Sequence, residues 1–179
     1  MKRFSLRSKV IIPVIILTVA IIVVLASSGQ KPITKKPVVG GKAPDFILND
    51  LNQREVRFSE VYKKNRVTVL NFWATWCPPC RSEIPEFIDF SRQYQAAHLE
   101  LLAVNLRESS EKVRAFYDAQ GINFPVLLDE SGRVSSAYEV QAIPTTLVID
   151  ENGIIRDLIM GSISKAKLVK ITENILEEK

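Results

Sequence analysis

Residues 67–80 read VTVLNFWATWCPPC, and this stretch decides the fold. Its first six residues, 67–72, are rich in β-branched and aromatic side chains, which predicts a buried strand. A helix is predicted from near Cys77 to about residue 97, because apolar residues recur on one face at helical spacing. These residues are Ile84, Phe87, Ile88, Phe90 and Tyr94. The two cysteines, Cys77 and Cys80, therefore lie where a strand passes into a helix.

Strands and helices alternate on both sides of this unit. Turn residues and β-branched runs predict strands at 46–48, 55–58, 99–105, 124–128, 145–149 and 154–160. Helices are predicted at 59–62, 110–120, 134–138 and 164–176, with Ser59 capping the first of them. This alternation, closed by a hairpin and a helix, predicts an α/β domain whose mixed sheet is covered on both faces.

The N-terminus carries a candidate membrane segment. Residues 10–26 hold no charged residue, and a helix of this run is roughly 25 Å long, close to the hydrocarbon core of about 30 Å. The basic tail, residues 1–9, is then expected in the cytoplasm and the rest of the chain outside. We expect an uncleaved transmembrane anchor over residues 10–28. A cleaved signal peptide is the alternative, because Ala26, Ser27 and Ser28 are small enough for a peptidase.

Charge is distributed unevenly along the chain. The net charge of the whole chain is +4, yet residues 1–42 hold eight of the 24 Lys and Arg residues and no Asp or Glu. Residues 43–179 therefore hold 16 basic and 20 acidic residues, a net charge of −4. Residues 29–42, rich in Gly, Pro and Lys, predict a linker, and residues 43–179 are the predicted domain. A domain of this charge gives no electrostatic reason to expect nucleic acid as a partner.

Four kinds of site use a Cys-Xaa-Xaa-Cys pair. A structural disulfide that closes four residues stabilises a fold by only about 2 kcal/mol, and a domain of this size does not need one. Zinc needs three or four ligands, and His98, expected at the surface, has no partner spaced for ligation. Covalent haem attachment needs a His directly after the second cysteine, where the chain has Arg81. A redox dithiol fits best, because a helix start stabilises the thiolate of Cys77, which is then expected to be the more exposed nucleophile. Cys80, one turn on and less exposed, resolves the mixed disulfide.

The motifs around the cysteines resemble those of the thioredoxin superfamily. They are FWATWCPPC, Pro85 inside the helix, and Ile-Pro-Thr at 143–145 before a late strand. The N-terminal APDFILND, the extra helix–strand unit at about 110–128 and WCPPCRSEIPEF narrow the resemblance to the TlpA/ResA-like membrane-anchored branch. The resemblance covers about residues 42–178. It implies a thioredoxin fold with an N-terminal β-hairpin and a central helix–strand insertion, preceded by one transmembrane helix, and a redox disulfide that needs no cofactor or metal.

The resemblance also implies residue roles. Cys77 is the nucleophile, and Cys80 is the resolving thiol. Pro144 is a cis-proline that faces them, and the backbone of Ile143 is presented to an extended partner segment. Glu83 is a carboxylate near the thiols with a role in their protonation. The alternative for Glu83 is a solvated glutamate that favours the helix dipole.

Three further positions near the cysteines are informative. Trp76, adjacent to Cys77, is expected at a partner-binding rim rather than in the core. Pro78, followed by Pro79, removes a backbone donor near the sulfurs and is also expected at the partner-binding site. Asn71 stands where ordinary thioredoxins carry a buried aspartate, so a buried acid that relays protons must be another residue.

These features predict an extracytoplasmic thiol-disulfide oxidoreductase that acts as a reductant. The membrane-anchored relatives reduce apocytochrome c before haem attachment and take electrons from a membrane thiol carrier of the CcdA/DsbD kind. We expect the same kinds of protein partner here, and a monomer. Two alternatives stay open: a peroxiredoxin, whose Pro-x-x-x-Thr-x-x-Cys signature is absent, and copper delivery of the Sco kind. The Sco family uses three residues between its cysteines and a distant His, whereas the spacing here is two.

Overall fold

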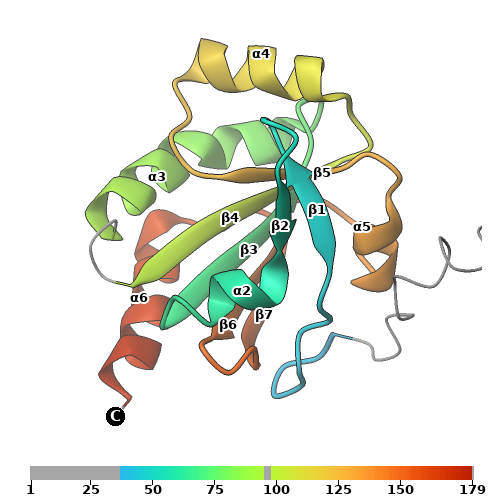
Figure 1. Ribbon diagram of the computed structural model, residues 1–179. Helices are drawn as coiled ribbons and strands as arrows, with labels where there is room; N and C mark the ends of the chain where they lie inside the picture. Colours follow the sequence, from blue (N-terminus) through green and yellow to red (C-terminus); the bar gives the residue numbers. More distant parts are fainter. Residues whose placement is uncertain (1–36, 95–97, 179) are drawn as a thin grey trace, which may run out of the picture. The chain divides into compact units, whose positions relative to one another are not determined.

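The computed structural model describes residues 37–94 and 98–178, which form a seven-stranded sheet packed with helices (Figure 1). The strands are β1 (Ile47–Asp50), β2 (Glu55–Arg57), β3 (Val67–Trp73), β4 (Leu99–Leu106), β5 (Val126–Asp129), β6 (Thr145–Asp150) and β7 (Ile155–Met160). The helices are α2 (Phe58–Tyr62), α3 (Pro78–Tyr94), α4 (Ser110–Gln120), α5 (Arg133–Ala137) and α6 (Lys165–Glu177). Each strand and helix expected between residues 46 and 176 is present, and the α/β class is confirmed.

The sheet is mixed, with the order β2-β1-β5-β4-β3-β6-β7. The central strands β3, β4 and β5 are parallel, and the remaining neighbours are antiparallel. Parallel neighbours need a crossover connection, which α3 supplies between β3 and β4 and α4 supplies between β4 and β5. The carboxyl ends of β3 and β4 therefore lie side by side, and residues that follow these two strands can meet at this edge.

Alternating side chains of the central strands supply two hydrophobic clusters, one on each face of the sheet. Val69 of β3 and Leu101 of β4 belong to a first cluster, to which α3, α4 and α6 contribute. Their chain neighbours Leu70 and Leu102 belong to a second cluster, which includes residues of α2 and α5. Figure 1 shows the helices on both sides of the strands. The prediction of a sheet covered on both faces is confirmed.

The predicted cap of the first short helix is wrong. The N-cap residue of α2 is Arg57, which makes no side-chain cap hydrogen bond. Ser59 lies inside the helix, where its backbone N–H and its hydroxyl donate to Asp45 at 2.8 and 2.9 Å. The carboxylate from a distant segment therefore takes the bonds that a local cap would make. Gly121, in contrast, ends α4 in the left-handed conformation with φ of 62°, as expected for a glycine at the end of a helix.

The chain joins the domain at the end of the sheet opposite the cysteines. Because β3 and β6 are antiparallel, the turn between β6 and β7 lies beside the start of β3, whereas the cysteines follow its end. In this turn Ile154 forms a β-bridge with Lys42, a residue of the predicted linker. Gly40 donates to the carbonyl of Ile155 at 2.8 Å, and the N–H of Ile155 donates to Gly41 at 2.9 Å. The end of the predicted linker therefore packs on the domain.

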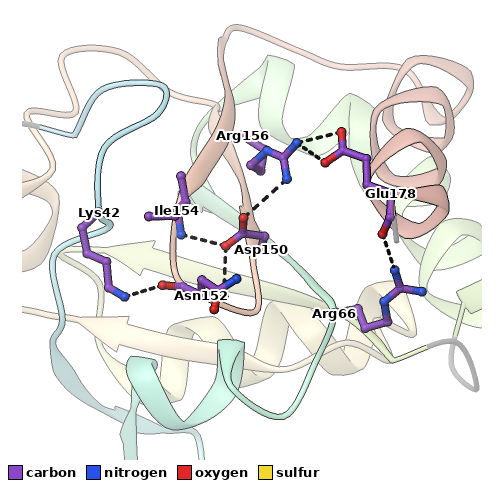
Figure 2. Close-up of polar contacts among 7 residues, drawn as sticks. All are labelled: Lys42, Arg66, Asp150, Asn152, Ile154, Arg156 and Glu178. Carbon is purple, nitrogen blue, oxygen red and sulfur yellow. Dashed lines mark hydrogen bonds and ion pairs between the residues drawn. The ribbon is translucent and has the colours of Figure 1, made fainter.

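Asp150 organises the same turn, as Figure 2 shows. Its Oδ1 accepts two backbone N–H groups of the turn, at 3.0 and 2.9 Å. Arg156 donates to Oδ2 of Asp150 at 3.4 Å and to the Glu178 carboxylate at 2.8 Å, and the carbonyl of Glu178 accepts from Arg66 at 3.2 Å. The ammonium of Lys42 donates to a carbonyl of the turn. These contacts tie the turn to the end of α6 and to the segment before β3.

The predicted tail and membrane segment, residues 1–9 and 10–28, lie outside the described residues. Within residues 37–94 and 98–178, no helix is long and apolar enough to cross a membrane.

Candidate active site

A disulfide joins Cys77 and Cys80 at the start of α3, with their Cα atoms 5.3 Å apart. Cys77 follows β3 and directly precedes the helix, and Cys80 lies in its first turn. The backbone N–H of Cys80 donates to Sγ of Cys77 at 3.2 Å. One backbone donor of the helix start, the N–H of Cys80, therefore points at the Cys77 sulfur, an environment that stabilises a thiolate.

Both sulfurs are covered in the disulfide form. Cys77 is 2% exposed and Cys80 is 1% exposed, so the greater exposure predicted for Cys77 is absent in this form. The Ile143–Pro144 peptide bond is cis, as predicted. The carbonyl oxygen of Ile143 lies 3.7 Å from Sγ of Cys77. The backbone before β6 therefore covers Cys77, which accounts for its low exposure.

Glu83 lies one helical turn beyond Cys80, on the inner face of α3. Its side chain is 3% exposed, so it is not a solvated surface carboxylate. Oε1 accepts from the Asn71 amide at 3.1 Å, and Oε2 accepts from the backbone N–H of Ile163 at 3.2 Å. Burial raises the pKa of Glu83 to about 7, these two hydrogen bonds oppose the rise, and the charge of Glu86 adds to it. A carboxyl that titrates near neutral pH can both accept and supply a proton.

Cys80 and Glu83 share a small cavity of about 10 Å³. Its remaining lining is Asn71, Trp73, Ile84, Phe87, Ala103, Tyr117, Ile122 and Phe124. Mostly apolar walls disfavour a charged carboxylate, which is the physical cause of the raised pKa of Glu83. The un-ionisable Asn71 donates to Thr146 at 3.0 Å as well as to Glu83, so it holds the acid in place.

Apolar side chains are exposed on the segments around the disulfide. Trp76 is 63% exposed, as expected for a residue at a partner-binding rim. Pro78 is exposed as well. Met160, at the end of β7, is 70% exposed and pairs with Thr145, the residue that follows the cis-proline. The sequence did not indicate Met160, because its position depends on the pairing of β6 with β7.

Glu108, on the loop after β4, is a second residue that sequence reasoning missed. Its carboxylate accepts the backbone N–H of Thr75 at 2.7 Å and the hydroxyl of Thr75 at 2.6 Å. Thr75 lies just before the cysteines. The signal that could have found Glu108 is topological: parallel strands bring the residues that follow them to one edge of the sheet. Here Trp73 of β3 pairs with Asn105 of β4.

The described residues also bear on the zinc alternative. Across residues 37–94 and 98–178, no group of three or more His, Cys, Asp or Glu side chains could hold a metal ion. His98 is exposed directly before β4, in the surface position expected for it.

Known proteins resemble the chain over most of this domain. A family model described as the AhpC/TSA family matches residues 39–158. Thiol-disulfide oxidoreductase ResA of Geobacillus thermodenitrificans is 36% identical over 137 residues, which cover 76% of this chain and 78% of that protein. The chain belongs to the ResA-like thiol-disulfide oxidoreductases.

Two further matches extend this ResA-like assignment. ResA of Bacillus subtilis is 39% identical over 90 residues, and this match spans 50% of the chain and 49% of that relative's length. A crystal structure described as a thiol:disulfide interchange protein DsbE from Chlorobium tepidum superposes with a TM-score of 0.72 and 31% identity. This match covers 79% of this chain and 99% of the Chlorobium tepidum chain. The predicted family and the thiol-disulfide oxidoreductase activity are confirmed.

The AhpC/TSA description does not restore the peroxiredoxin alternative for this ResA-like chain. The peroxiredoxin signature places Thr three residues and Pro seven residues before its cysteine. Counting back from Cys77 gives Ala74 and Leu70, and counting back from Cys80 gives Cys77 and Trp73. The chain therefore lacks the signature at both cysteines.

Proposed function

We propose that this oxidoreductase works outside the cytoplasmic membrane and reduces disulfides in envelope proteins such as apocytochrome c before haem attachment. The observation that carries the proposal is the position of the disulfide, with the Ile143 carbonyl 3.7 Å from Sγ of Cys77. The neighbouring Trp76 is 63% exposed. An extended partner segment can pair with the backbone at Ile143 while an apolar side chain packs on Trp76. The disulfide of the partner is then brought to Cys77.

The reaction moves two electrons from the cysteine pair to the partner and needs no cofactor. The thiolate of Cys77 attacks one partner sulfur, the partner's S–S bond breaks, and the released partner thiolate takes a proton. Cys80 then loses its proton and attacks Sγ of Cys77, which forms the Cys77–Cys80 disulfide and releases the second partner thiolate. A membrane thiol carrier of the CcdA/DsbD kind returns two electrons and restores the dithiol.

Glu83 exchanges the proton of Cys80 in this scheme. The two residues share one small cavity, and burial raises the pKa of Glu83 to about 7. The carboxylate accepts the proton when Cys80 attacks and returns it when the disulfide is reduced. A buried acid beside Cys80 also disfavours a stable thiolate there. Since strong oxidants of this superfamily stabilise their reduced form, this arrangement supports a reductant.

The proposal also places the domain at the outer face of the membrane, held by residues 10–28 as an uncleaved anchor. Support comes from the uncharged run and the basic residues that precede it. Fractionation of cells that make the full chain should find the protein in membranes that have been washed with high salt. A soluble form that begins near Gly29 would contradict the anchor and indicate a cleaved signal peptide.

Trapping the mixed disulfide tests the function directly. The Cys80→Ser variant lacks the resolving thiol, so a partner attacked by Cys77 should stay bound until a reductant is added. An oxidised peptide with the sequence Cys-Xaa-Xaa-Cys-His, the c-type haem attachment motif, serves as the substrate. Cys77→Ser is the matched control and should form no adduct. Adducts on the control but not on Cys80→Ser would reverse the two roles, and no reaction of the wild type with the peptide would contradict the apocytochrome assignment.

A further inference from the structure

The loop that leads into the disulfide is a tight turn. Cys77 donates its backbone N–H to the carbonyl of Ala74 at 3.2 Å, so Thr75 and Trp76 are the two central residues of a four-residue turn. This turn sets the directions of the exposed Trp76 side chain and of the Cys77 sulfur. The turn's own hydrogen bond leaves the N–H of Thr75 without a partner inside the turn.

Glu108 supplies that partner from the loop after β4. Its Oε2 accepts the N–H of Thr75 at 2.7 Å and the Asn105 amide at 2.9 Å. Its Oε1 accepts the hydroxyl of Thr75 at 2.6 Å and the ammonium of Lys112 at 2.7 Å. Burial opposes a charge on Glu108, yet the bonds from Lys112, Thr75 and Asn105 outweigh burial and lower its pKa. The carboxylate is therefore charged at neutral pH and accepts four donors.

We propose that Glu108 is a positioning residue of the exchange reaction, because it holds the Ala74–Cys77 turn in the geometry that a protein partner meets. In the disulfide form, Cys77 is also fixed by its bond to Cys80. In the dithiol form that bond is gone, and the turn is held from outside through Thr75. The inference rests on the proposed role of Cys77 as the attacking thiol.

A positioning role should affect the reaction with a protein substrate but not the reaction with a small reagent. A protein disulfide has to meet Trp76 and Cys77 together, whereas iodoacetamide needs only the Cys77 thiolate. Glu108→Ala should raise KM for insulin about tenfold, the equivalent of one charge-assisted hydrogen bond of about 1.4 kcal/mol. The rate of Cys77 alkylation in the reduced protein should stay within about twofold of the wild type. Glu108→Gln should restore KM, because one amide oxygen still accepts the N–H of Thr75 and the amide nitrogen can donate to its hydroxyl.

Asp45, the chain neighbour of Phe46 in the second hydrophobic cluster, offers a matched control. Its carboxylate accepts the N–H and the hydroxyl of Ser59 at 2.8 and 2.9 Å, and a guanidinium nitrogen of Arg57 at 3.2 Å. Asp45→Ala therefore removes the same kinds of contact as Glu108→Ala, but it loosens α2 instead of the active-site turn. It should lower stability and leave KM for insulin unchanged.

Thr75→Val provides a second test if Glu108→Ala does not fold. It removes the hydroxyl but keeps the N–H, so a smaller rise in KM is expected with unchanged alkylation. An unchanged KM in folded Glu108→Ala would overturn the positioning role. If only Thr75→Val folds, an unchanged KM in that variant would overturn it. An equal rise in KM for Asp45→Ala would also overturn it, because the effect would then follow stability alone. Wild-type protein in which iodoacetamide labels Cys80 before Cys77 would instead refute the proposed role of Cys77.

Discussion

Replacing Glu83 with Gln should change how the stability of the oxidised protein depends on pH. Burial raises the pKa of Glu83 to about 7 in the folded protein, against an ordinary value of 4.5. The folded state therefore binds this proton more tightly than the unfolded state does. The stability that Glu83 contributes is fully present below pH 4.5 and is lost as the pH rises through about 7. The loss amounts to about 3 kcal/mol, at about 1.4 kcal/mol for each pH unit between the two values.

The free energy of unfolding, measured by urea denaturation from about pH 4 to about pH 8, gives this quantity. The disulfide stays intact in the assay, so the cysteines do not titrate. Gln cannot accept from both Asn71 and Ile163, and this defect shifts the variant's curve by an amount that does not depend on pH. The difference in the free energy of unfolding between Glu83→Gln and the wild type should therefore shift by about 3 kcal/mol in favour of the variant as the pH rises from about 4 to about 8.

Asp89→Asn is the control, because Asp89 lies on the same helix with its side chain 64% exposed. This variant should follow the wild-type curve. Parallel curves for Glu83→Gln and the wild type would refute the reasoning. The carboxyl would then have no raised pKa, and it could not exchange the proton of Cys80 near neutral pH.

Three further predictions concern the Cys77 thiol, the exposed Trp76 and the Asp150 turn at the opposite end of the sheet. In the reduced protein below about pH 7, mass spectrometry should find Cys77 alkylated before Cys80, because the helix start stabilises its thiolate; the reverse order would exchange their roles. Trp76→Ala should raise KM for insulin about tenfold and leave alkylation of Cys77 unchanged, since an exposed aromatic anchor contacts only the partner. An unchanged KM would remove Trp76 from the binding rim. Asp150→Ala should lower the free energy of unfolding by about 2 kcal/mol, because two backbone donors lose their acceptor, with insulin reduction unaffected. A loss of activity at equal fractions folded would show that this network reaches the active site.

Local sequence signals were sufficient for the elements of the fold. The β-branched run of β3 was recognisable because a central parallel strand is buried on both faces and needs no alternation. Asn152-Gly153 is a sequence signal for the β6–β7 hairpin, and Gly121 is one for the end of α4. Both glycines have positive φ, a conformation that few other residues adopt. The motif around the cysteines then identified the redox pair directly.

Side-chain surroundings that depend on distant segments were harder to predict. The sequence placed Glu83 one turn after Cys80, but one donor to its carboxylate is the N–H of Ile163, which is 80 residues away along the chain. Serine is a residue type that favours the N-cap position of a helix, yet the hydroxyl of Ser59 donates to Asp45, 14 residues earlier. Glu108 carries no motif at all, because its contact with Thr75 follows only from the parallel register of β3 and β4.

The pairing of Lys42 with Ile154 decides how this oxidoreductase can be attached to a support. The N-terminal segment leaves the domain beside the start of β3, and the disulfide follows the other end of that strand, roughly 20 Å away. An electrode, bead or fusion protein linked before residue 37 should therefore leave the Trp76 rim open to solution. Coupling through Met160 or the residues near Pro78 should instead block it. An electrode coating made from this domain should accordingly be coupled through its N-terminus.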